Sequence, residues 1–137
     1  MPTNETQPAA LEKQHGMFRF DFTEGDGAGV IASCANPLGV DAYIKRALLV
    51  VTTPSTAAAT VDAGVAAAIG TSNDQLFDGK SVATAGVFDN MNDTDNGTNG
   101  LVGLFWDADN FLTIAEASGD VTGLVGFMLL DLADVTP

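Results

Sequence analysis

The stretch from Ala42 to Val65 constrains the fold of this chain more than any other. Its first part, Ala42–Thr53, ends in the β-branched run Val-Val-Thr-Thr, which suits a pleated strand. Pro54 follows and ends this strand, because proline has no N–H to give to a sheet. In the second part, residues 60–65 alternate strictly between two faces. The pattern predicts two strands joined by a short turn.

Other segments carry strand patterns of varying strength. In residues 17–23, Phe18, Phe20 and Phe22 share one side and are expected to form one end of the core. The middles of Ala42–Thr53 and of the last strand, 121–132, are apolar on both sides, so we expect both strands to be central and neighbouring. The remaining segments are a strand at 29–35, weak pieces at 75–78, 81–83 and 86–88, and a hairpin of 101–106 with 111–115 around the turn 107–110.

Length and turn spacing place these strands in one domain. The chain has 137 residues, and its turn clusters, rich in Gly, Asn and Asp, recur about every dozen residues. We therefore expect an all-β fold, either a single-domain antiparallel β-sandwich of jelly-roll type or a β-barrel. Residues 1–16 read as a flexible N-terminal arm and 17–137 as the domain. Leu11 is the arm's candidate anchor for docking on a neighbouring subunit.

The charge excludes several partners. With 18 acidic and 5 basic residues the formal net charge is −13, which repels nucleic acid and anionic membrane surfaces. The longest apolar run, 123–130, is far shorter than the ~20 residues of a membrane span. We expect neither nucleic acid nor a membrane as a partner.

The sequence offers only weak candidates for catalytic residues. Cys34 is the only cysteine and His15, the only histidine, lies in the predicted arm, so Cys34 reads as a small buried hydrophobe. Asp107 and Asp109 form an acidic pair in a predicted turn, a placement that favours turn formation over acid–base chemistry. The chain is not expected to be an enzyme, and no cofactor is expected.

The loop Asp89–Asn99 offers weak calcium candidates. Asp89, Asp93 and Asp95 supply oxygen ligands, but the spacing of an EF-hand is missing. A turn-rich surface loop is the favoured interpretation.

A few side chains are candidates for protein contacts. Lys45 and Arg46 are adjacent in a chain that is poor in cations; pairing with local carboxylates at the solvent-exposed end of the strand is favoured over contact with an acidic neighbour. Tyr43 and Trp106 are large aromatic residues that suit a core or an interface. The interface candidates are Leu11, Tyr43, Lys45, Arg46 and Trp106.

A run of short motifs resembles small virion proteins of tailed bacteriophages. The motifs keep their order and cover roughly Val30 to Leu132. They are 31–39 (Ile-Ala-Ser-Cys-Ala-Asn-Pro-Leu-Gly), Tyr43-Ile44, 50–53 (Val-Val-Thr-Thr), 59–65, 74–79, 85–90 and 123–126 (Gly-Leu-Val-Gly).

The resemblance is to head decoration (cement) proteins and related capsid-surface components. It implies a protein of the capsid exterior that binds the major capsid protein between capsomers and stabilises the head, as a homo-oligomer, typically a trimer. A tail- or fibre-associated adhesion protein of the same virion and a calcium-dependent carbohydrate-binding module are the alternatives.

Overall fold

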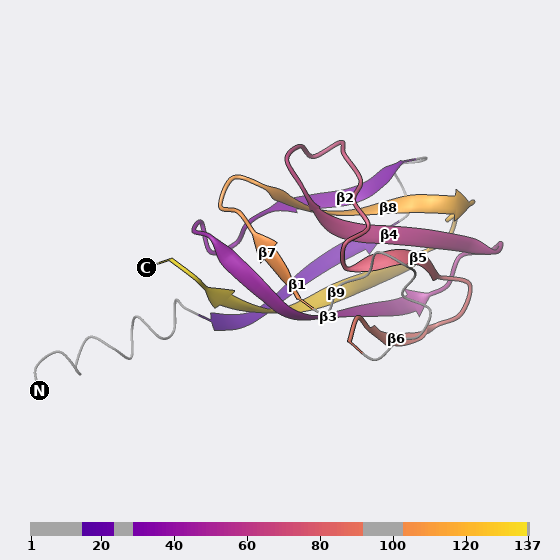
Figure 1. Ribbon diagram of the computed structural model, residues 1–137. Coiled ribbons are helices and arrows are strands. Elements are labelled where there is room, and N and C mark those ends of the chain that lie inside the picture. Colours follow the sequence, from indigo (N-terminus) through magenta and orange to yellow (C-terminus); the bar gives the residue numbers. More distant parts are fainter. Residues whose placement is uncertain (1–14, 24–28, 92–102, 137) are drawn as a thin grey trace, which may run out of the picture.

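The computed structural model describes residues 15–23, 29–91 and 103–136, and within these residues all regular structure is strand (Figure 1). The strands are β1 (His15–Thr23), β2 (Val30–Ala35), β3 (Ala42–Thr53), β4 (Ala59–Ala66), β5 (Phe77–Ser81), β6 (Gly86–Asp89), β7 (Leu104–Trp106), β8 (Phe111–Gly119) and β9 (Val125–Asp134). Because β1 begins at His15, the last two residues assigned to the arm belong to the first strand. Residues 1–14 lie outside the described part of the chain.

Two antiparallel sheets pack face to face. One has the order β1-β9-β3-β6, with β7 also paired to β3, and the other has the order β2-β8-β4-β5. Figure 1 shows them as two layers, which confirms the predicted sandwich over the barrel. β3 and β9 are central neighbours, as predicted.

The strands pair from the two ends of the chain inward. β1 pairs with β9, β2 with β8, β3 with β6 and β4 with β5, all antiparallel. The chain therefore forms one long ribbon of strand pairs that alternate between the two sheets, which is the jelly-roll arrangement.

The core lies between the sheets and contains the inward residues of both. Phe20 and Phe22 are buried and Phe18 is half-buried, so the predicted alternation in β1 is confirmed. The largest fully buried side chain is that of Trp106, whose ring centre lies 6.5 Å from that of Phe18. The Trp106 indole N–H donates to the backbone oxygen of Asn110 at 3.0 Å.

The predicted hairpin of 101–106 with 111–115 is wrong. β7 pairs with β3 and β8 pairs with β2 and β4, so the two strands belong to different sheets. The turn between them does form, with the N–H of Asn110 donating to the oxygen of Asp107 at 3.0 Å. The last strand is also shorter at its start than predicted, because Val121 and Leu124 are buried in a turn before β9.

Candidate interaction surface

A β-bulge in β3 places two cations on the outer face of the five-stranded sheet. The register with β9 shifts between Ile44 and Arg46, so one extra residue, Lys45, is inserted into β3. Lys45 and Arg46 are consequently both exposed, whereas their neighbours Ile44 and Ala47 are buried. The bulge thus turns two consecutive side chains to the same side of the sheet.

Each cation on this face lies beside a carboxylate. Lys45 Nζ is 3.5 Å from Asp131 Oδ1 on β9, and Arg46 forms a salt bridge with Asp89 on β6. The hydrogen bond to Asp89 raises the pKa of the Arg46 guanidinium above its ordinary value. On β1, Arg19 Nε donates to an oxygen of Asp21 at 2.8 Å. The prediction that Lys45 and Arg46 pair with carboxylates of the chain is confirmed, but these carboxylates lie on β9 and β6, whereas local ones were predicted.

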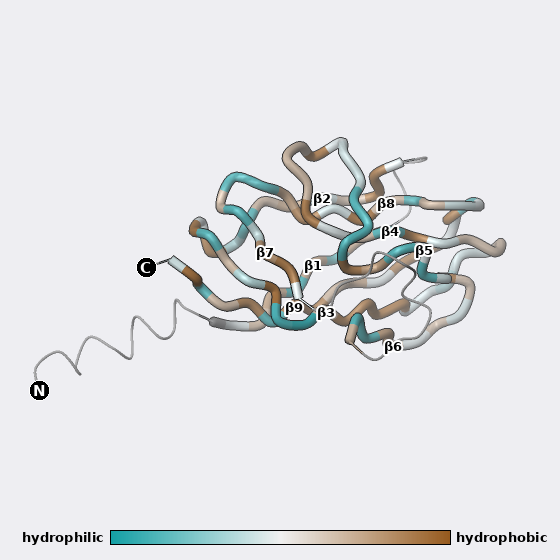
Figure 2. The backbone as a smooth tube through the Cα atoms, in the orientation of Figure 1, coloured by the Kyte–Doolittle hydropathy of each residue, from teal (hydrophilic) through white to brown (hydrophobic). Residues whose placement is uncertain are grey.

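Next to these charges lies a group of five apolar side chains, here called the apolar block. Register places Phe127, Val50 and Val87 in one cross-strand row, and Leu129 and Leu48 in the row beside it. Val87 is 63% exposed and the other four are half-buried. Figure 2 shows hydrophobic stretches of β3 and β9 in this sheet.

The apolar block and the charges are in contact. The guanidinium of Arg19 lies 3.7 Å from the centre of the Phe127 ring, a cation–π distance. Arg19 is also directly across the sheet from Leu129, and Asp21 is across from Phe127. The outer face is therefore one continuous surface of mixed apolar and charged character.

A pair of aromatic side chains lies toward the other end of the same face. Tyr43 on β3 is paired with Phe105 on β7, and their side chains are 41% and 51% exposed. A Cβ at Gly103 would lie 2.1 Å from the Tyr43 hydroxyl, so the ring occupies space that only glycine leaves open.

The structure therefore brings three of the five predicted interface residues to one face. Tyr43, Lys45 and Arg46 lie together there, and Leu11 is outside the described residues. Trp106 is wrong as an interface residue, because its side chain is 0% exposed and belongs to the core between the sheets. Arg19 and the apolar block were not predicted from the sequence; the signal for Phe127, Leu129, Val50 and Leu48 was that the middles of β3 and β9 are apolar on both sides.

Those acidic candidates that the structure describes, Asp89, Asp107 and Asp109, form local turn and ion-pair contacts. Asp107 Oδ1 accepts the backbone N–H of Asp109 at 2.9 Å, which is a turn-forming bond. The Asp89 carboxylate accepts from Arg46 and from the N–H of Met91, so an ion bound there would have to displace these donors. Asp93 and Asp95 lie outside the described residues, and within those residues no cluster of three His, Cys, Asp or Glu side chains could hold a metal.

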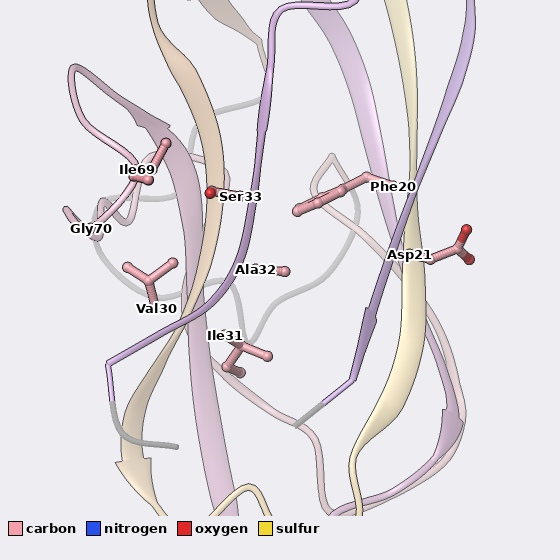
Figure 3. A pocket seen from close by; sticks show the side chains of 8 residues that line it. All are labelled: Phe20, Asp21, Val30, Ile31, Ala32, Ser33, Ile69 and Gly70. Carbon is pink, nitrogen blue, oxygen red and sulfur yellow. The ribbon is translucent and has the colours of Figure 1, made fainter. Parts of the chain in front are cut away.

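An open groove of about 510 Å³ lies between β1 and β2, next to the loop that contains Ile69 and Gly70 (Figure 3). Figure 3 shows the Phe20 ring pointing toward β2, whereas the Asp21 carboxylate points away from the groove. The other lining residues are Val30, Ile31, Ala32 and Ser33. Of the side chains that line the groove, those of Asp21 and Ser33 carry polar groups, and the Asp21 carboxylate points away from it.

Away from this face, burial is the main cause of a raised pKa at two of the described groups, Cys34 and Asp62. Burial raises the pKa of the Cys34 thiol to about 12, which fits its predicted role as a hydrophobe packed against the core. Burial also raises the pKa of Asp62, the nearby Asp78 and Asp74 raise it further, and a hydrogen bond from the Gly79 N–H opposes them.

Comparisons with family models, with curated proteins and with solved structures find no match. In the part of the chain that the structure describes, no helix is long and apolar enough to cross a membrane.

Proposed function

We propose that this protein decorates and stabilises the head of a tailed bacteriophage. It binds the major capsid protein on the outer capsid surface between capsomers, and it acts as a trimer. The observation that carries the proposal is the outer face of the β1-β9-β3-β6 sheet. A broad surface with an apolar centre and charged surroundings is typical of protein–protein contacts.

The motif resemblance supports the same proposal. Its segments fall in β2 and the turn after it, in β3, β4, β5 and β6, and around the start of β9. They therefore belong to the strands and turns of one sandwich. Jelly rolls occur in viral capsid proteins and in lectins, so the fold alone does not choose between these classes.

The charge and the rigidity of the sandwich suit such a role. A chain of net charge −13 is repelled by packaged DNA, which favours contact with the protein shell. A rigid β core transmits load without rearranging, and the many copies on one head allow each contact to be modest.

The test is binding of the full chain to expanded heads that lack it. We expect the protein to cosediment with these heads in a saturable way, to appear between capsomers by electron microscopy, and to raise the temperature at which the heads release DNA. An unrelated acidic β-sandwich protein of similar size is the control for adsorption. Labelling of the tail instead of the head, or heads equally heat-resistant with and without the protein, would refute the proposal.

A further inference from the structure

The basic side chains of the protein are distributed unevenly. Among the described residues, the exposed lysines and arginines are Arg19, Lys45 and Arg46, and all three lie on the outer face of the five-stranded sheet. Lys80, the remaining one, is buried and lies over the Phe88 ring at 4.3 Å. The positive charge that the described surface offers is therefore on one face.

On that face the charges cancel. The three cations face three carboxylates: Asp21, Asp131 and Asp89. The other carboxylates of the described residues lie elsewhere: Asp41, Asp62, Asp74, Asp78, Asp107, Asp109, Glu116, Asp120 and Asp134. Counted over the described residues, the outer face is therefore neutral, whereas the chain as a whole has a net charge of −13.

This distribution of charge indicates which kind of partner can bind the outer face. Two copies of a chain with net charge −13 repel each other, and they approach most easily where the facing surfaces carry no net charge. Within a Debye length of roughly 8 Å at physiological salt, local charge governs the contact. A cationic partner would instead be drawn to the acidic surfaces, so a like-charged copy is the occupant that the face fits.

We infer that the outer face of the β1-β9-β3-β6 sheet, centred on the apolar block, is the contact surface for a second copy of this chain. The apolar block supplies the area that is removed from water, and the ion pairs around it provide the polar rim. This inference rests on the self-association in the proposed function and is independent of the capsid.

The test is the mass of the full chain in solution, measured by sedimentation equilibrium over a range of concentrations. Val87 and Met17, each 63% exposed on this face, are replaced singly in Val87→Glu and Met17→Glu. Ile69, 60% exposed beside the groove and off this face, gives the matched control Ile69→Glu. Each of the three variants replaces an apolar side chain with a glutamate at a similarly exposed position.

We expect the wild type to form assemblies larger than the 14.0 kDa monomer. Val87→Glu and Met17→Glu should each weaken association by about tenfold or more, whereas Ile69→Glu should leave it unchanged. At a dilution at which each protein is monomeric, all three variants should melt at the wild-type temperature, because association then no longer contributes to stability. A wild type that stays monomeric at its highest soluble concentration would overturn the inference. Equal association of all three variants would do the same.

The outcomes for the two proposals are separable. A protein that self-associates through this face but does not bind heads refutes the capsid role alone. Head binding by a protein that is monomeric in solution, with Val87→Glu as active as the wild type, refutes the contact between copies alone.

Discussion

The buried amide of Asn36 joins two turns at one end of the sandwich, and its replacement by alanine gives a calculable loss of stability. Its Nδ2 donates to the carbonyl oxygens of Val40 at 2.8 Å and Trp106 at 3.1 Å, and its Oδ1 accepts the N–H of Leu38 at 2.9 Å. At about 1 kcal/mol for each bond lost, Asn36→Ala should lower the free energy of unfolding by about 3 kcal/mol. For a domain of this size that is a fall in Tm of roughly 10 °C.

The assay is urea unfolding followed by the fluorescence of Trp106, which is the only tryptophan and is fully buried. The m-value should stay unchanged, since the same surface is exposed on unfolding. Asn73→Ala is the matched control: its amide donates to the Val65 oxygen at 3.0 Å, but the side chain is half-exposed and water can replace the bond. If Asn36→Ala costs no more than Asn73→Ala, the assigned role of the buried amide is wrong.

The substitution Asn36→Asp sharpens the same test because it keeps the shape of the side chain. It replaces the donating NH2 with a carboxylate oxygen that faces the carbonyl oxygens of Val40 and Trp106. At neutral pH the loss should exceed that of Asn36→Ala, since the new oxygen of the buried carboxylate has no donor and faces two carbonyl oxygens. Protonation at acid pH restores one donor, so the difference between Asn36→Asp and the wild type should shrink as the pH falls. A difference independent of pH would contradict the geometry.

Two further predictions follow from perturbed pKa values. Because the folded state raises the pKa of Asp62, ionised Asp62 disfavours folding above that pKa, and the penalty disappears as the pH falls toward the ordinary value of 3.8. Asp62→Asn, which keeps the acceptor for the Gly79 N–H, should therefore stabilise the protein by about 0.5 kcal/mol at pH 7 and not at pH 3, as measured by urea unfolding. Because burial raises the pKa of Cys34 to about 12, its reaction with a disulfide reagent at pH 8 should be roughly a thousandfold slower in the folded protein than in urea; equal rates would contradict this burial.

The sequence was informative about strands because their patterns are local. Alternation in β1 and the β-branched end of β3 identify segments that fit a pleated surface, and the structure has both. The doubly apolar middles of β3 and β9 also predict correctly that these strands are central, since a strand with apolar residues on both sides needs cover or a partner on each.

Pairing partners could not be predicted in the same way. β7 and β8 are separated by a four-residue turn, which is the usual spacing of a hairpin, yet the turn carries the chain from one sheet to the other. Local sequence does not distinguish these outcomes, because strand pairing depends on contacts between residues that are far apart in the chain. The outer face was unpredictable for the same reason: it combines β1, β3, β6 and β9, whose positions are set only by the complete topology.

The bulge at Lys45 explains why alternation fails in β3. Counting by twos from Ala42 and Ile44, which are buried, would direct the charged Arg46 into the core and Ala47 out to solvent. One inserted residue reverses the count, so that Ala47, Leu49 and Val51 are buried while Arg46, Leu48 and Val50 face outward. The exposure of both cations on the outer face thus follows from the bulge.

Deletion of Lys45 tests this account. Without it, Ile44 remains opposite Leu132 and Arg46 opposite Asp131, so the strand becomes regular and every other side chain keeps its side. The deletion loses one exposed ion pair, and the free energy of unfolding should stay within about 1 kcal/mol of the wild type. Deletion of Leu48, three residues along the same strand, leaves the bulge and turns the following side chains to the wrong face, so it should abolish cooperative unfolding. Equal damage from the two deletions would show that the bulge is not what sets the direction of the side chains in β3.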